Sequence, residues 1–228
     1  MQTIAIIPAR GGSKRIPRKN ILPFCGKPMI ARSIETALES RVFDAVVVST
    51  DDEEIAALAA SYGAQAPFRR PPELSNDHAS TESVIAHSIR WWEENRVPVD
   101  FACCIYATSP FLRAEFLREG FRILKENPDA EFAFSVTSYA APIFRAIQLG
   151  ESGRVEMFWP ENEMKRSQDL PEAWHDAGQF YWGRKNAFLE NAGVFTARSY
   201  PVVLPRHLVQ DIDTPEDWER AERMFLAS

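Results

Sequence analysis

The sequence of 228 residues has the length of one α/β domain, and its 45% apolar and 25% charged residues are typical of a soluble globular protein. No apolar run approaches the roughly 20 residues that cross a bilayer, and the N-terminus resembles a first strand rather than a signal peptide, which predicts a cytoplasmic protein without a membrane partner. The net charge of −6 argues against a nucleic-acid-binding domain, which would normally be basic.

The charge is unevenly distributed along the chain. The first 34 residues contain no Asp or Glu, and this segment therefore carries a local excess of positive charge that indicates an anion-binding site. Its cationic residues are Arg10, Lys14, Arg15, Arg18, Lys19, Lys27 and Arg32.

Apolar and β-branched runs alternate with segments of helical hydrophobic period. The predicted strands are residues 3–8, 45–49, 101–106, 132–136, 179–183 and 202–204. The predicted helices are residues 29–38, 55–62, 81–94 and 114–126, and a last helix begins with a capping Thr214 and Pro215. This alternation predicts one α/β domain over residues 1–228, with a doubly wound, mostly parallel sheet covered by helices on both faces.

The segment 138–170 interrupts the alternation. It contains short β-like runs around Gly150 and Gly153 and no long helix, which predicts a hairpin or small β-rich element. Because Phe158 and Trp159 lie outside the repeating pattern, we expect this element to project from the domain and form a homodimer contact.

A basic loop with two glycines, PARGGSKRIPRKN, follows the first predicted strand at residues 8–20. Gly11 and Gly12 let the backbone approach a ligand and expose its N–H groups, as in phosphate-binding nests. Arg10, Lys14 and Lys19 can add cationic contacts at the carboxyl end of a strand, where open α/β sheets bind ligands. The loop matches neither the P-loop nor the dinucleotide-binding pattern. On these residues alone, a phosphate site and a solvated basic turn are both open.

Two aspartates, Asp211 and Asp213, directly precede the last predicted helix. In an extended chain, residues two apart point to the same side, so their carboxylates can converge. A carboxylate pair beside a polyphosphate supplies the hard oxygen ligands that Mg²⁺ prefers. The alternative is that Asp213 only helps to cap the helix.

These motifs resemble the CMP-sialic acid synthetase (acylneuraminate cytidylyltransferase) family, whose hallmarks are A-R-G-G-S-K-x-x-P-x-K-N after the first strand and D-I-D-T-P-E-D before the last helix. A third family element, R-P-x-E-L-x-x-D-x-A-S, matches residues 70–80. The resemblance covers essentially the whole chain and implies a Mg²⁺-dependent enzyme with Lys14, Asp211 and Asp213 as catalytic residues and the two aspartates as metal ligands. The implied CTP-binding residues are Arg10, Gly11, Gly12, Ser13, Lys14, Lys19, Asn20, Arg70, Ser80 and Thr81.

The choice of sugar follows from two departures from the sialic acid enzymes. Tyr106-Ala107 stands where those enzymes usually have Gln-Pro, and WHDAGQFY at residues 174–181 replaces an Asn-Gly-Ala-Ile-Tyr-type run. Both departures resemble the branch of the family that uses pseudaminic acid; the rival acceptors are legionaminic acid, N-acetylneuraminic acid and KDO. For His175, a structural hydrogen bond is an equally open interpretation. The residues expected to contact the sugar are Tyr106, Thr108, Ser109, Lys165, Arg166, His175, Gln179 and Phe180.

The implied reaction joins CMP from CTP to the anomeric hydroxyl of an acidic nine-carbon sugar, with release of pyrophosphate. Two anionic reactants must meet, which accounts for a cationic loop and a metal ion. An alternative from another class is a non-catalytic CTP- or sugar-binding regulator. The intact Lys14, Asp211 and Asp213 argue against a regulator, because a binder does not need a metal pair at the α-phosphate.

Overall fold

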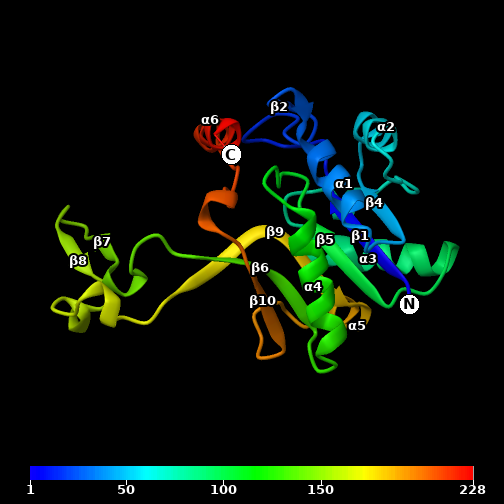
Figure 1. Ribbon diagram of the computed structural model, residues 1–228. Coiled ribbons are helices and arrows are strands. Elements are labelled where there is room, and N and C mark those ends of the chain that lie inside the picture. The colour runs from blue at the N-terminus through cyan, green and yellow to red at the C-terminus, as the bar shows by residue number, and fades with distance from the viewer. Residues whose placement is uncertain (228) are drawn as a thin grey trace.

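The computed structural model describes residues 1–227 and contains one six-stranded sheet of order β10-β6-β9-β5-β1-β4 (Figure 1). Five strands run parallel, and β9 is antiparallel to both of its neighbours, β5 and β6. The predicted mostly parallel α/β sheet is confirmed. The strands are β1 (Thr3–Pro8), β4 (Ala45–Ser49), β5 (Phe101–Ile105), β6 (Phe132–Ser138), β9 (Trp174–Arg184) and β10 (Ser199–Val203).

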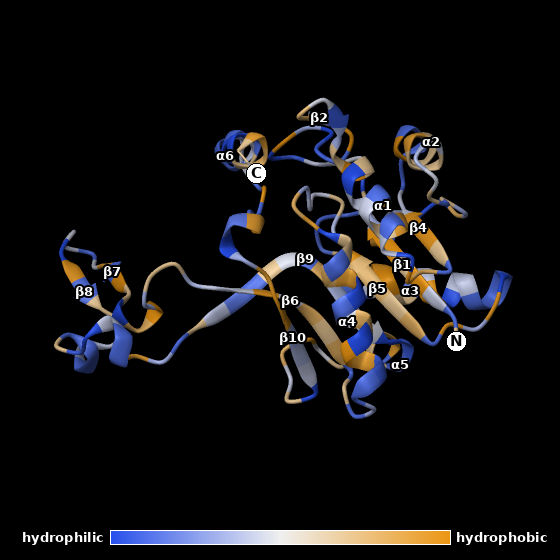
Figure 2. Ribbon diagram, viewed as in Figure 1, coloured by the Kyte–Doolittle hydropathy of each residue, from blue (hydrophilic) through white to orange (hydrophobic). Residues whose placement is uncertain are grey.

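Helices cover both faces of the sheet because alternate strand residues point to opposite sides. Ala5 and Ile7 of β1 pack in a core with α1, α2 and α4, while Ile4 and Ile6 pack in a second core with α3 and α5. Figure 2 shows the central strands as mainly hydrophobic and the helices as mixed, as such a three-layer arrangement requires. In residues 1–227, no helix has the length and apolar character needed to cross a membrane. The helices are α1 (Met29–Ser40), α2 (Glu53–Ser61), α3 (Thr81–Asn95), α4 (Ala114–Glu126), α5 (Lys185–Leu189) and α6 (Pro215–Leu226).

A third apolar cluster joins the two ends of the chain. Phe24, in the small hairpin of β2 (Pro23–Phe24) and β3 (Lys27–Pro28), packs edge-on against Trp218 of α6 with ring centroids 5.4 Å apart. Thr214 caps α6 in a reciprocal capping box with Asp217, which confirms the predicted helix start. The cluster therefore holds the segment before α6 close to the loop that follows β1.

Residues 138–170 form an arm that lies away from the sheet, at the left of Figure 1. It contains an antiparallel hairpin of β7 (Ile147–Leu149) and β8 (Val155–Met157), as predicted. Apolar side chains on it are exposed, including Leu149 at 76% and Val155 at 60%. Such a surface is unusual for a chain that stays monomeric.

The structure differs from the sequence prediction at β9, which begins at Trp174 rather than at residue 179. Residues 174–178 (WHDAG) lack apolar alternation, and their strand conformation comes from pairing with β6, where Val136 faces Asp176 and Ser138 faces Trp174. Helix α5 was not predicted, because its five residues are too few to show a helical period.

Candidate active site

A cleft of about 340 Å³ opens at the carboxyl ends of β1 and β5, between the loop after β1 and the segment leading into α3. Its charged lining is five cations, Arg10, Lys14, Arg15, Lys19 and Arg70, and one anion, Asp77. The cleft is therefore suited to a polyanion. The predicted site residues that line it are Arg10, Ser13, Lys14, Lys19, Asn20, Arg70, Thr81, Tyr106 and Thr108.

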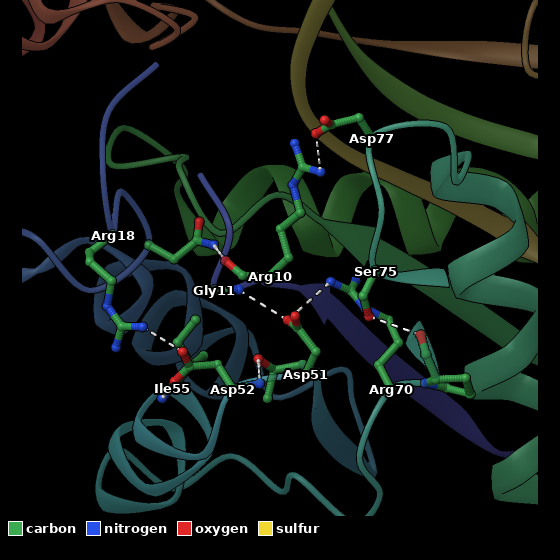
Figure 3. Close-up of polar contacts among 12 residues, drawn as sticks. Arg10, Gly11, Arg18, Asp51, Asp52, Ile55, Arg70, Ser75 and Asp77 are labelled. Carbon is green, nitrogen blue, oxygen red and sulfur yellow. Dashed lines mark hydrogen bonds and ion pairs between the residues drawn. The ribbon is translucent and has the colours of Figure 1, made fainter. Parts of the chain in front are cut away.

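The loop after β1 is fixed by contacts with its own backbone and with the turn after β4 (Figure 3). The buried Asn20 donates from Nδ2 to the Arg10 carbonyl at 2.9 Å. The Gly11 N–H donates to Asp51 Oδ1 at 3.0 Å, and a Cβ on Gly11 would lie 2.6 Å from Asp52 Oδ2. Gly11 is thus required for close approach to the β4–α2 turn, and its N–H is used there rather than as the phosphate donor predicted.

Two of the cleft cations share one carboxylate. Arg10 Nη1 lies 2.6 Å from Asp77 Oδ1, and Lys14 Nζ donates to Asp77 Oδ2. The hydrogen bond from Lys14, and to a lesser extent that from Arg10, lowers the pKa of Asp77 below its ordinary value. The carboxyl group therefore stays ionised. Sequence reasoning did not single out Asp77, although it lies within the element at residues 70–80.

Arg70 is the buried cation of the cleft, with only 4% of its surface exposed. Its Nε donates to Ser75 Oγ at 3.2 Å, and Nη2 lies 3.8 Å from Asp51 Oδ1 (Figure 3). Burial lowers the pKa of Arg70, and the charge of Asp51 opposes that shift. Since a guanidinium stays protonated in proteins, Arg70 is a fixed positive charge beside the cleft.

The carboxylate pair lies next to the cleft, as expected from the sequence. Asp213 Oδ1 is 2.8 Å from Arg15 and 3.4 Å from Lys19, and Lys19 Nζ also donates to the Ile212 carbonyl at 2.6 Å. Asp211 is exposed as a whole residue, but its carboxyl group is partly desolvated. This desolvation raises the pKa of Asp211, and repulsion from Asp213 raises it further. Arg15, to which sequence reasoning gave no role, therefore connects the loop to the pair.

The pair fits a hard divalent cation with few protein ligands. Within residues 1–227, no group of three or more His, Cys, Asp or Glu is placed to hold a metal ion. Two carboxylates that repel each other still offer two oxygen ligands, and Mg²⁺ is commonly held by one or two carboxylates with phosphate and water completing its shell. A metal at this pair would depend on a bound nucleotide.

Four predicted site residues have structural roles in the core or at a helix start. Ser80 caps α3 by accepting from the Ser83 N–H at 3.2 Å. Ser109 is buried, and Gln179 is buried with Nε2 donating to the Leu208 carbonyl at 2.6 Å. Phe180 has no exposed surface and packs in the core, so we assign it a packing role in place of the predicted sugar contact.

Three other predicted residues lie on the arm or where it joins the sheet. Lys165 donates to Asn162 Oδ1 at 2.8 Å, and Arg166 pairs with Asp169 at 2.7 Å. His175 Nδ1 lies 2.8 Å from the carbonyl oxygen of Asp176, in line with the structural interpretation. None of the three lines the cleft of its own chain.

A second cavity of about 170 Å³, here called the side pocket, adjoins the cleft through a shared wall of Thr81 and Tyr106. The Tyr106 ring lies 5.6 Å from that of Tyr181, whose hydroxyl donates to Asp176. Burial raises the pKa of Tyr106 to about 12, so its hydroxyl remains a neutral donor. Tyr181 and Asp176 belong to the run at 174–181, but only the strand pairing of β9 shows which of its residues face this pocket.

An open α/β sheet with a cationic cleft at its strand ends and a carboxylate pair beside it suits a nucleotidyltransferase, which must bind a nucleoside triphosphate. Residues 4–226 match the cytidylyltransferase family model, and the chain belongs to this family.

Two relatives agree with this family, and one solved structure shares the fold. It is 47% identical, over 99% of its length and 97% of the relative's, to the pseudaminic acid cytidylyltransferase of Campylobacter jejuni. It is 30% identical to the CMP-N,N'-diacetyllegionaminic acid synthase of Legionella pneumophila, again over 99% and 97% of the two chains. CMP:2-keto-3-deoxy-manno-octonic acid synthetase, solved in complex with CTP, has the same fold, with a TM-score of 0.71 and 19% identity over 100% of this chain and 99% of that one.

Proposed function

We propose that this protein transfers CMP from CTP to the anomeric hydroxyl of pseudaminic acid, giving CMP-pseudaminic acid and pyrophosphate. The observation that carries the proposal is the cleft itself, which five cations line beside the Asp211–Asp213 pair. The 47% identity to a pseudaminic acid cytidylyltransferase over nearly the whole chain supports the same reaction.

The nucleotide half of the reaction rests on fixed positive charge. Arg10 and Lys14 can bind phosphate oxygens once these have displaced Asp77. Arg70 adds a positive charge on a side chain that is buried beside the cleft. These groups neutralise the triphosphate and the charge that develops as pyrophosphate leaves. The protein contributes positioning and electrostatic stabilisation, and no covalent intermediate with the chain is required.

We propose Asp211 and Asp213 as the ligands of Mg²⁺. When bound, the ion would neutralise phosphate charge and make the α-phosphorus a better electrophile. Lys19 donates to the Ile212 carbonyl between the two aspartates, and Lys19 and Arg15 hold the Asp213 carboxylate beside the cleft loop.

We propose that the acceptor sugar binds at the cavity walls around Tyr106. This residue lines both the cleft and the side pocket, and an aromatic ring with one hydroxyl suits a deoxy sugar better than the Gln of sialic acid enzymes. N-acetylneuraminic and legionaminic acid remain the alternative acceptors.

We also propose a homodimer built through the arm, since the arm exposes apolar side chains away from the sheet. Lys165 and Arg166 lie on the arm and outside the cleft of their own chain. If they contact the sugar, they reach it in the cleft of the second chain. The cytoplasmic location expected from the sequence remains a prediction.

A competition assay tests the acceptor. The enzyme receives CTP, Mg²⁺ and equal amounts of pseudaminic and N-acetylneuraminic acid, and the CMP-sugars are identified by mass spectrometry. We expect CMP-pseudaminic acid to predominate. Predominant CMP-N-acetylneuraminate would overturn the acceptor and leave the cytidylyltransferase reaction standing, whereas CTP binding without any CMP-sugar would favour the regulator.

A further inference from the structure

The cleft and the side pocket have opposite electrostatic character although they share a wall. The cleft has five cations and one anion in its lining. The charged lining of the side pocket is Glu82 and Asp176, both acidic, and the rest is aromatic, aliphatic, Thr81 or Cys104. An anionic group is therefore attracted to the cleft and repelled from the side pocket.

Both carboxylates act on the interior of the side pocket. Cys104, which is 1% exposed, forms part of the wall, and burial raises the pKa of its thiol with further contributions from Glu82 and then Asp176. Both carboxylates thus line the same cavity, although they come from α3 and β9.

The Asp176 carboxylate is held in one orientation. Its Oδ1 accepts from the Gly178 N–H at 2.8 Å, and its Oδ2 accepts from the Tyr181 hydroxyl. Each carboxylate oxygen has two lone pairs, so acceptor capacity remains on both oxygens. Carboxylate oxygens accept hydrogen bonds, and the acidic lining of the side pocket therefore offers hydrogen-bond acceptors.

The geometry of the reaction fixes which end of the sugar meets which cavity. In an acidic nine-carbon ketose, the anomeric carbon carries both the reacting hydroxyl and the carboxylate. Both groups must face the nucleotide in the cationic cleft. The far part of the sugar, which bears the acylamino substituents, then lies toward the wall of Thr81 and Tyr106 and the side pocket behind it.

We propose that Asp176 and Glu82 are specificity-determining residues that accept the N–H of an acylamino substituent in the side pocket and disfavour acceptors that lack this donor. The inference rests on the proposed function, and it adds that selection of the sugar depends on these two carboxylates. The volume of about 170 Å³ is sufficient for one acylamino group but not for the whole sugar.

The test compares steady-state kinetics of wild type, Asp176→Asn and Glu82→Gln. Each is assayed with pseudaminic acid and with an analogue that has hydroxyl groups in place of the acylamino groups. We expect the preference for the acylamino sugar to fall by about 10- to 100-fold in Asp176→Asn and by less in Glu82→Gln. The loss should appear in KM for the sugar, while KM for CTP stays unchanged.

Glu94→Gln is the matched control, since it removes the same charge from the same helix outside the side pocket. Asn at 176 keeps an oxygen for the Gly178 N–H, and an unchanged melting temperature verifies the fold. If both variants keep the wild-type preference while wild type makes CMP-pseudaminic acid, the specificity proposal fails and the function stands. If wild type turns over no sugar, both proposals fail.

Discussion

The side-chain amide of Gln179 donates a 2.6 Å hydrogen bond to the backbone carbonyl of Leu208, three residues before Asp211. Gln179 lies in the interior of β9 and is only 4% exposed, so the bond ties the segment before α6 to the central sheet. The Asp211–Asp213 pair is therefore positioned from two sides, by Gln179 through Leu208 and by Lys19 through Ile212.

Gln179→Leu should make the position of Asp211 and Asp213 less well fixed, although neither aspartate is changed. The change leaves a buried carbonyl without its donor, which costs about 1–3 kcal/mol of unfolding free energy. We also expect a higher Mg²⁺ concentration for half-maximal rate, measured by metal titration of pyrophosphate release. Substitution of the exposed Gln65 by Leu is the control. An unchanged metal requirement in Gln179→Leu would reduce the residue to a packing role.

Lys14→Ala should reduce turnover by about 10²–10³, because a point charge on the triphosphate is lost from the transition state. Lys27→Ala is the control, since Lys27 comes from the same cationic segment but pairs with Glu35 outside the cleft. Initial rates at saturating CTP separate a loss of kcat from a loss of binding. A near-normal kcat/KM would instead support the interpretation of the loop as a solvated basic turn.

Asp213→Ala should abolish turnover while the protein remains folded, because the residue is half-buried beside the cleft and outside the core. Glu216→Ala, at an exposed position in the first turn of α6, removes the same charge and should keep activity. The readouts are pyrophosphate release at saturating Mg²⁺ and thermal unfolding. Wild-type turnover that survives EDTA would contradict the metal assignment.

Asp77→Asn should tighten CTP binding by about two- to fivefold, since the nucleotide no longer displaces a carboxylate from Arg10 and Lys14. The pKa of Asp77 is depressed, so its carboxyl is ionised above about pH 4 and the difference between variant and wild type should be constant there. It should disappear only as the pH falls through the depressed pKa. Isothermal titration with CTP and with tripolyphosphate measures it. Weaker binding by the variant would mean that Asp77 positions the two cations for the nucleotide.

Leu149→Glu combined with Val155→Glu should convert the proposed dimer to a monomer, because the two exposed apolar residues lie on the arm hairpin. Light scattering at micromolar concentration gives the mass. Leu226→Glu, an equally exposed apolar position at the end of α6, should leave the dimer intact. A wild-type monomer with full activity would defeat the proposed assembly.

The nucleotide side of the site could be predicted because it comes from continuous motifs. Residues 10–20 follow one strand directly, and seven of the ten predicted CTP-binding residues line the cleft. The requirement for glycine at position 11 was not predictable, because a side chain there would collide with Asp52, which lies 41 residues further along the chain.

The acceptor side was less predictable because it depends on pairing between distant segments. The run at 174–181 was correctly noticed, but Phe180 and Tyr181 alternate across the sheet, so one packs in the core and the other lines the side pocket. Which of them faces outward follows from the register Ile105–Phe180 and Cys104–Tyr181 between β5 and β9. A single sequence does not specify that register, nor the ion pair between Arg15 and Asp213.

The reversed direction of β9 has a consequence for how the site can change. Parallel strands deliver side chains to this edge from the loops that follow them, whereas β9 delivers Asp176 from its own beginning and then continues through the core. Only residues 170–173 separate the last helical turn of the arm, η4 (Ser167–Asp169), from β9, so the backbone that leaves the arm soon becomes the strand that shapes the side pocket. The proposed acceptor contact and the proposed dimer contact therefore lie at the two ends of one continuous segment, while the nucleotide loop belongs to other elements. If Asp176 selects the sugar as proposed, mutations at the beginning of β9 can change the accepted sugar without altering the loop after β1.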